Sequence, residues 1–112
     1  MRDKVLQVYQ ALVSDHDDII IKGQKSAYTA LNGNMFSFVD PEGLMCLRLS
    51  KEDKNTFERT HGTGEVVQYG AVMRGYVPVP ELLLNDPVTM KDLFAKSVVN
   101  ARTLKPKPTK KS

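Results

Sequence analysis

The chain of 112 residues has no tryptophan, one cysteine and no long run of apolar residues. A single cysteine excludes a disulfide within the chain, which fits a reducing compartment. The first residues, Met1-Arg2-Asp3-Lys4, are not followed by the apolar stretch that a signal peptide or a membrane-spanning helix requires. We therefore expect a cytoplasmic protein without a membrane partner.

Strong charge of one sign is also absent from most of the chain. Residues 1–104 carry a formal net charge of −1, and the chain reaches +3 only through the lysines of its last eight residues, Lys105, Lys107, Lys110 and Lys111. Lysine alternating with proline forms no helix and buries no apolar surface, so we expect a disordered basic tail over residues 105–112. Residues 1–104 have the size of one domain. The tail is either a solubilising end or an electrostatic arm for an acidic partner such as nucleic acid.

Two turn signals predict a three-stranded antiparallel meander. Asn32-Gly33 favours a tight hairpin turn, because asparagine tolerates and glycine readily adopts a positive φ. Asp40-Pro41-Glu42-Gly43 predicts a second turn that closes with Gly43 in the left-handed region. The strands are expected at residues 27–31, 35–39 and 44–49.

Helices are predicted on either side of this meander and at the end of the chain. Apolar residues recur at helical spacing over residues 5–13. Ser50 is placed to cap a helix that reaches about Thr60 and ends at Gly62. Asp86-Pro87 begins a final helix whose apolar face runs from Met90 to Leu104 and covers the sheet.

The remaining β-rich segments add two strands at residues 65–69 and 72–79. Pro78 lacks a backbone donor, so the second strand should end there or lie at a sheet edge. Ile19-Ile20-Ile21 reads as a short strand or the entry to one. The predicted class is α+β, with an antiparallel sheet of about five strands in the order helix, three strands, helix, two strands, helix.

No constellation typical of a metal or catalytic site occurs in the sequence. His16, His61 and Cys46 are isolated, without spacings such as C-x-x-C or H-E-x-x-H. The acidic residues 15–18 lack the glycine and the distant glutamate of a calcium loop. We therefore predict no catalytic, cofactor-binding or metal-binding residue and expect a protein that is not an enzyme.

Three residues on predicted strands form a candidate interaction surface: Arg48, Arg74 and Tyr76. Met45, Leu47 and Leu49 occupy one face of this strand, and Arg48 shares the other face with Leu44 and Cys46. Because the first face is entirely apolar and the second carries a charge, the Arg48 face is predicted to be the more exposed one. Arginine and tyrosine are common at protein interfaces. The alternative is an ordinary cross-strand salt bridge beside a rim aromatic.

Three segments in register resemble the N-terminal domain of the TfoX/Sxy family of bacterial competence regulators. They are Asn32-Gly33-Asn34-Met35-Phe36, then Leu44 to Leu49 followed by Lys51-Glu52-Asp53, and Val72-Met73-Arg74-Gly75-Tyr76-Val77-Pro78-Val79. The resemblance covers roughly residues 5–104. It implies a two-layer sandwich similar to the secretion-chaperone type of fold, and a non-enzymatic role in transcription regulation.

The function predicted from these observations is that of a regulatory or protein-interaction module. We expect it to dock a protein partner through its sheet face or an exposed edge strand, and an open edge would also support a homodimer. Two alternatives stay open at this stage. One is an accessory protein that binds nucleic acid through the lysine tail, and the other is a small enzyme whose pocket the sequence does not reveal.

Overall fold

The computed structural model describes residues 2–23, 26–68 and 70–105. Its elements follow one another as α1 (Arg2–Ser14), β1 (Ala27–Leu31), β2 (Asn34–Val39), β3 (Met45–Arg48), α2 (Lys51–His61), β4 (Val67–Gln68), β5 (Ala71–Val72), β6 (Tyr76–Pro78), the 3-10 helix η1 (Glu81–Asn85) and α3 (Pro87–Thr103). The structure is α+β, as the sequence predicts.

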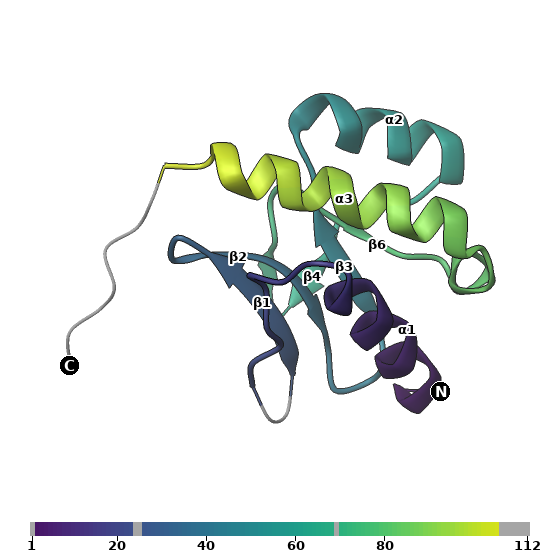
Figure 1. The fold of residues 1–112 in the computed structure, drawn as a ribbon. Helices are drawn as coiled ribbons and strands as arrows, with labels where there is room; N and C mark the ends of the chain where they lie inside the picture. The colour runs from purple at the N-terminus through teal and green to yellow at the C-terminus, as the bar shows by residue number, and fades with distance from the viewer. Residues whose placement is uncertain (1, 24–25, 69, 106–112) are drawn as a thin grey trace.

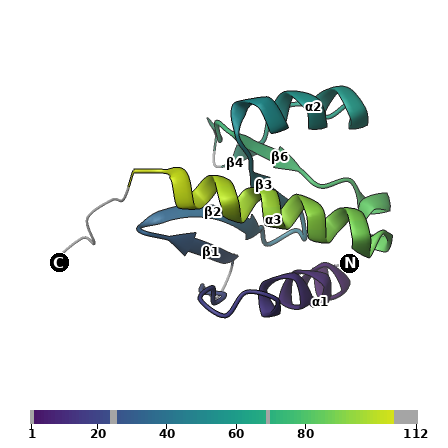
Figure 2. The same cartoon turned by 45° about the horizontal axis from the view of Figure 1, so that its top comes forward.

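Four strands form an antiparallel sheet in the order β1-β2-β3-β6, and β4 and β5 form a separate two-stranded hairpin. α1 and α3 lie over one face of the sheet, while β4 lies behind it (Figures 1 and 2). A bulge interrupts β2, since Thr29 faces Ser37 but Ala30 faces Met35, which leaves Phe36 as the extra residue. The bulge lets Phe36 and Ser37 both point toward the helices.

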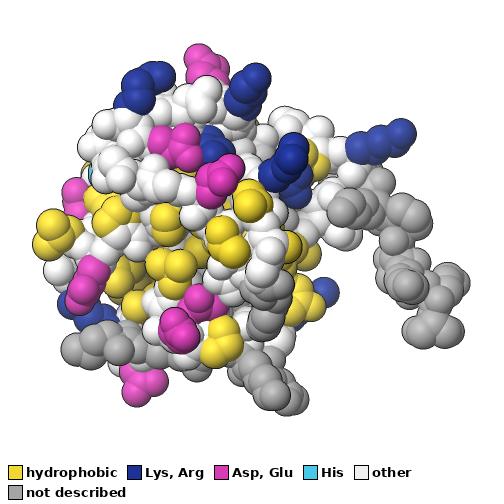
Figure 3. Space-filling model, turned by 180° about the vertical axis from the view of Figure 1, so that it is seen from behind, with side chains coloured by type: hydrophobic (Ala, Val, Ile, Leu, Met, Phe, Trp, Pro, Cys, Tyr) yellow, Lys and Arg dark blue, Asp and Glu magenta, His cyan; other side chains and the backbone are white. Residues whose placement is uncertain are grey.

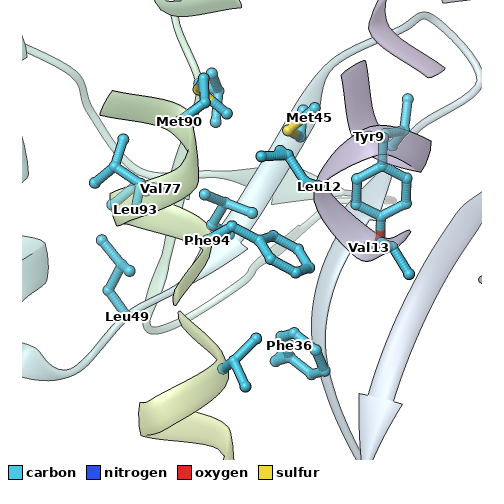
Figure 4. Close-up of a cluster of buried hydrophobic side chains, with 14 of the residues drawn as sticks. Tyr9, Leu12, Val13, Phe36, Met45, Leu49, Val77, Met90, Leu93 and Phe94 are labelled. Atoms are coloured by element: carbon cyan, nitrogen blue, oxygen red, sulfur yellow. The ribbon is translucent and has the colours of Figure 1, made fainter. Parts of the chain in front are cut away.

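The helix-covered face holds the main core. Side chains from α1, α3 and the sheet converge there around Phe94, whose ring lies 6.0 Å from that of Phe36 and 6.4 Å from that of Tyr9 (Figure 4). Phe57 of α2 joins the same cluster, and α2 contacts β6. We call this cluster the helix-side core; its fully buried members are Tyr9, Phe36, Val39, Met45, Leu47, Val77, Met90, Phe94 and Ala101.

The opposite face of the sheet carries a second, smaller cluster under the β4–β5 hairpin. We call it the hairpin-side cluster, and its buried residues are Phe38, Cys46, Val66 and Tyr76. The rings of Phe38 and Tyr76 lie 5.4 Å apart, and the Tyr76 hydroxyl donates a 2.7 Å hydrogen bond to the carbonyl of Met35. Both faces of the sheet are therefore covered.

The local signals at turns and helix ends are confirmed. Asn32 and Gly33 have φ angles of 53° and 81°, and Gly43 has a φ of 94°. Ser50 Oγ accepts a hydrogen bond from the backbone N–H of Asp53, and Gly62 ends α2 in the left-handed region. β6 ends at Pro78 at the edge of the sheet.

The number of strands in the sheet is corrected from about five to four. The segment 72–79, predicted as one strand, is divided at Arg74-Gly75, where Gly75 has a φ of 85° and the chain turns. Its first part pairs within the hairpin and only Tyr76–Pro78 joins the sheet. Three strands instead of two therefore follow α2. Ile19-Ile20-Ile21 forms no strand; the isolated bridge nearby joins Lys22 to Tyr28.

Candidate functional site

Arg48 ends β3 at a point where three parts of the chain meet. Its carbonyl accepts a 2.7 Å hydrogen bond from Ser97 Oγ of α3, which fixes the end of the strand against the helix. Ser50, two residues later, caps α2. The half-buried Arg48 side chain therefore emerges between β3 and the start of α2.

Arg74 reaches the same place from the hairpin. The turn at Arg74-Gly75 is held to the end of β3 by the hydrogen bond from the N–H of Leu49 to the carbonyl of Gly75, at 2.9 Å. Arg74 itself lies in this turn and is exposed, so its predicted place on a strand is wrong. The turn nevertheless brings the two arginines together across 26 residues of sequence.

Tyr76 is not an exposed partner of these arginines. It faces Arg48 across the β3–β6 ladder, but only 4 % of its surface is accessible. Burial raises the pKa of its phenol to about 12, which keeps it neutral. The prediction that the Arg48 face is the open one is also corrected, because Cys46 on that face is fully buried under the hairpin.

An open cleft of about 800 Å³ lies between the hairpin, the start of α2 and the end of α3. Four cationic side chains line it, namely Arg48, Lys51, Lys54 and Arg74, and Glu65 is its one acidic lining residue. Lys54 pairs with Glu58 at 2.7 Å. Within the described ranges, Arg48 and Arg74 make no ion pair, so the alternative of a cross-strand salt bridge is wrong for these residues.

The walls of this cleft also include apolar residues. Val72 of β5 lines it with 46 % of its surface exposed, and Leu49 and Leu104, the residues directly after β3 and α3, also line it. Seen from behind (Figure 3), on the side where β4 lies in Figure 1, hydrophobic side chains gather in the middle, Lys and Arg side chains lie mostly toward the upper border, and Asp and Glu side chains lie among both. The arrangement suits a ligand that carries both carboxylates and apolar groups.

The predicted lysine tail is described only at its first residue. Lys105 is exposed, and its carbonyl accepts a 3.0 Å hydrogen bond from Asn34 Nδ2 at the β1–β2 turn. It does not line the cleft, although Leu104 does. Lys107, Lys110 and Lys111 lie outside the described residues.

Comparison with known proteins finds no relative. No family model, no curated protein and no solved structure matches the chain. The function is therefore inferred from the site itself.

The other reactive side chains are built into the two clusters. Burial raises the pKa of the Cys46 thiol to about 12, with the charge of Asp40 adding to the effect. Burial likewise raises the pKa of Tyr9 to about 12, against the opposing effect of its 2.6 Å hydrogen bond with Ser37. These groups are neutral and inaccessible near neutral pH, which is the opposite of what a nucleophile requires.

Two kinds of feature are absent from the described ranges. No group of three or more His, Cys, Asp or Glu side chains is arranged to hold a metal ion. No helix there is long and apolar enough to cross a membrane.

Sequence reasoning identified the two arginines but missed their companions in the cleft. Lys51 and Lys54 stand one turn apart at the start of α2, and Glu65 and Val72 stand on the hairpin. The spacing of Lys51 and Lys54 could have predicted that they lie on one face of the helix, because residues three apart are neighbours on a helix surface. That the hairpin approaches α2 could not be predicted from the sequence, because it depends on how the chain folds back after Gly62.

Proposed function

We propose that the protein is a non-enzymatic interaction module that binds an acidic segment of a protein partner in the cleft of Arg48 and Arg74. The observation that carries the proposal is that these two arginines converge there without an ion pair within the described residues. An unpaired guanidinium at a partly enclosed surface favours a carboxylate, which it binds through two parallel hydrogen bonds. The regulatory complex that the TfoX/Sxy resemblance implies is the setting we propose, in the cytoplasm.

A protein partner accounts for the cleft better than nucleic acid does. Binding of single-stranded nucleic acid uses exposed aromatic rings on which bases stack. Among the described aromatic residues, only Tyr28 is not buried, and it lies on β1 and does not line the cleft. Glu65 would also repel a phosphate backbone, whereas a peptide places its carboxylates individually.

The test is binding of a fluorescein-labelled peptide that alternates Glu with Val, followed by fluorescence anisotropy at low salt. Arg48→Ala and Arg74→Ala should each weaken binding about tenfold or more, since a charge-assisted hydrogen bond contributes roughly 1.5–3 kcal/mol. Binding should also fall with rising salt. Arg59→Ala is the matched control, because Arg59 is exposed near the end of α2 and does not line the cleft.

Two outcomes would contradict the proposal. One is that the peptide does not bind at low salt, or binds both cleft variants as tightly as the unmodified protein. The other is that single-stranded or duplex DNA binds more tightly than the peptide and loses affinity when residues 105–112 are deleted. The second result would favour the lysine tail as the functional element.

A further inference from the structure

The hairpin offers an open strand edge beside the cleft. Val67 faces Val72 and Gln68 faces Ala71, while the N–H of Met73 donates a 2.8 Å hydrogen bond to the carbonyl of Val66. Hydrogen-bonded and non-bonded pairs alternate along an antiparallel ladder, so Val67 and Val72 form a non-bonded pair. The N–H and C=O of Val72 therefore point away from β4, and no described strand lies beyond β5.

The edges of the larger sheet are less available. On β1, the N–H and C=O of Tyr28 are both taken by Lys22, at 2.9 and 2.8 Å. On β6, Pro78 has no N–H to donate. Among the described strands, β5 is therefore the edge that combines free backbone groups with a place in the cleft wall.

The side chains next to this edge have a fixed order. Val72 and Arg74 both line the cleft, Val72 from β5 and Arg74 from the turn that follows this strand. Arg48 approaches from β3 across the Arg74-Gly75 turn. An apolar position on β5 is thus followed along the cleft wall by a basic position in the turn.

We propose that the acidic segment binds as an extended strand added to β5, with its backbone paired to the N–H and C=O of Val72. This inference rests on the proposed function and specifies how the ligand lies. Strand addition supplies affinity through main-chain hydrogen bonds and specificity through alternate side chains. The ligand therefore carries an apolar residue opposite Val72 and an acidic residue nearer the Arg74-Gly75 turn that reaches Arg74 and Arg48.

Proline substitution tests the backbone pairing, because proline removes the N–H at its own position, and a matched proline controls for its restriction of φ. Val72→Pro removes an outward-pointing donor without removing a bond of the β4–β5 ladder. Val67→Pro is the matched control: it is the same change in the same non-bonded pair, on the opposite edge of the hairpin. Val72→Pro should weaken binding of the Glu-Val peptide about tenfold, the equivalent of one hydrogen bond of roughly 1.4 kcal/mol, whereas Val67→Pro should not.

If both proline variants disturb the hairpin, a second measurement tests strand addition without changing the protein. The unmodified protein is titrated with a peptide of the same sequence in which alternate residues are N-methylated, in both registers. Loss of binding for only one of the two methylated peptides supports strand addition. In an added strand, only one of the two alternating sets of peptide N–H groups faces β5. Equal binding of both methylated peptides and the parent would overturn the inference.

The result also separates this inference from the proposed function. If binding depends on Arg48 and Arg74 but is unaffected by Val72→Pro and by methylation, the acidic segment binds without strand addition. If no peptide binds at low salt, both proposals fail.

Discussion

The two faces of the sheet are covered in different ways. On one face, three helices of 11 to 17 residues bury a continuous core around Phe94 and Phe36. On the other, a hairpin with two residues in each strand covers four buried side chains and leaves Val67 and Val72 largely exposed. Because local stability follows buried apolar contacts, we expect the helix side to maintain the fold and the hairpin side to open more readily. The hairpin that covers the less buried face also forms one wall of the cleft, opposite α2 and α3.

The largest expected effect is on the helix side. Phe94→Ala removes a ring that is 1 % exposed and contacts the rings of Tyr9 and Phe36. The free energy of unfolding should fall by about 3–5 kcal/mol, as for other buried phenylalanines replaced by alanine. Urea unfolding followed by circular dichroism measures it.

A smaller change on the hairpin side is Val66→Ala, at a residue that is 3 % exposed. It removes two buried carbons, so the loss should be roughly 1.5 kcal/mol. If Val66→Ala lowered the free energy of unfolding as much as Phe94→Ala does, the hairpin side would contribute as much to stability as the helix side. That result would contradict the difference proposed between the two faces.

Local signals predicted much of the helix side. The Asn32-Gly33 turn, the Ser50 cap and the apolar face of α3 depend on residues close in sequence, and each is confirmed. The bulge at Phe36 was not predicted, because it shows only in the pairing of β1 with β2.

The hairpin side was predicted poorly, because its structure also depends on contacts between segments that are distant in sequence. The sequence 72–79 alternates well enough to suggest one strand, and nothing near it indicates that Val66 folds onto Phe38 and Tyr76. The candidate residues Arg48 and Arg74 were found from their residue type. Their convergence, and the burial of Tyr76, are consequences of tertiary contacts between segments distant in sequence.

Alkaline pH should weaken the protein, and Cys46 allows the hairpin side to be tested separately. Burial raises the pKa of this thiol from 9.0 to about 12, so its contribution to stability is complete below pH 9 and is lost as the pH rises toward 12. The raised pKa values of Tyr9 and Tyr76 lower the stability mainly above pH 10.0, which is the ordinary pKa of tyrosine.

The measurement is the urea midpoint between pH 8 and pH 10 for the unmodified protein and for Cys46→Ala. The unmodified protein should lose stability across this interval, whereas the variant, although less stable at pH 8, should show a flatter profile. Parallel profiles would contradict a protonated, buried Cys46.

The central claim is that the hairpin is a locally opening element whose outer edge receives the ligand. Amide hydrogen exchange resolved by nuclear magnetic resonance tests it most directly. Without peptide, the N–H of Met73, which is bonded to Val66, should exchange through openings that cost less free energy than global unfolding, unlike those of Leu47 and Val77, and the unbonded N–H of Val72 should exchange without an opening. With the Glu-Val peptide, exchange at Val72 should slow while exchange at Val67 does not change. Exchange of the hairpin only by global unfolding, or slowing at Val67 as much as at Val72, would contradict the account.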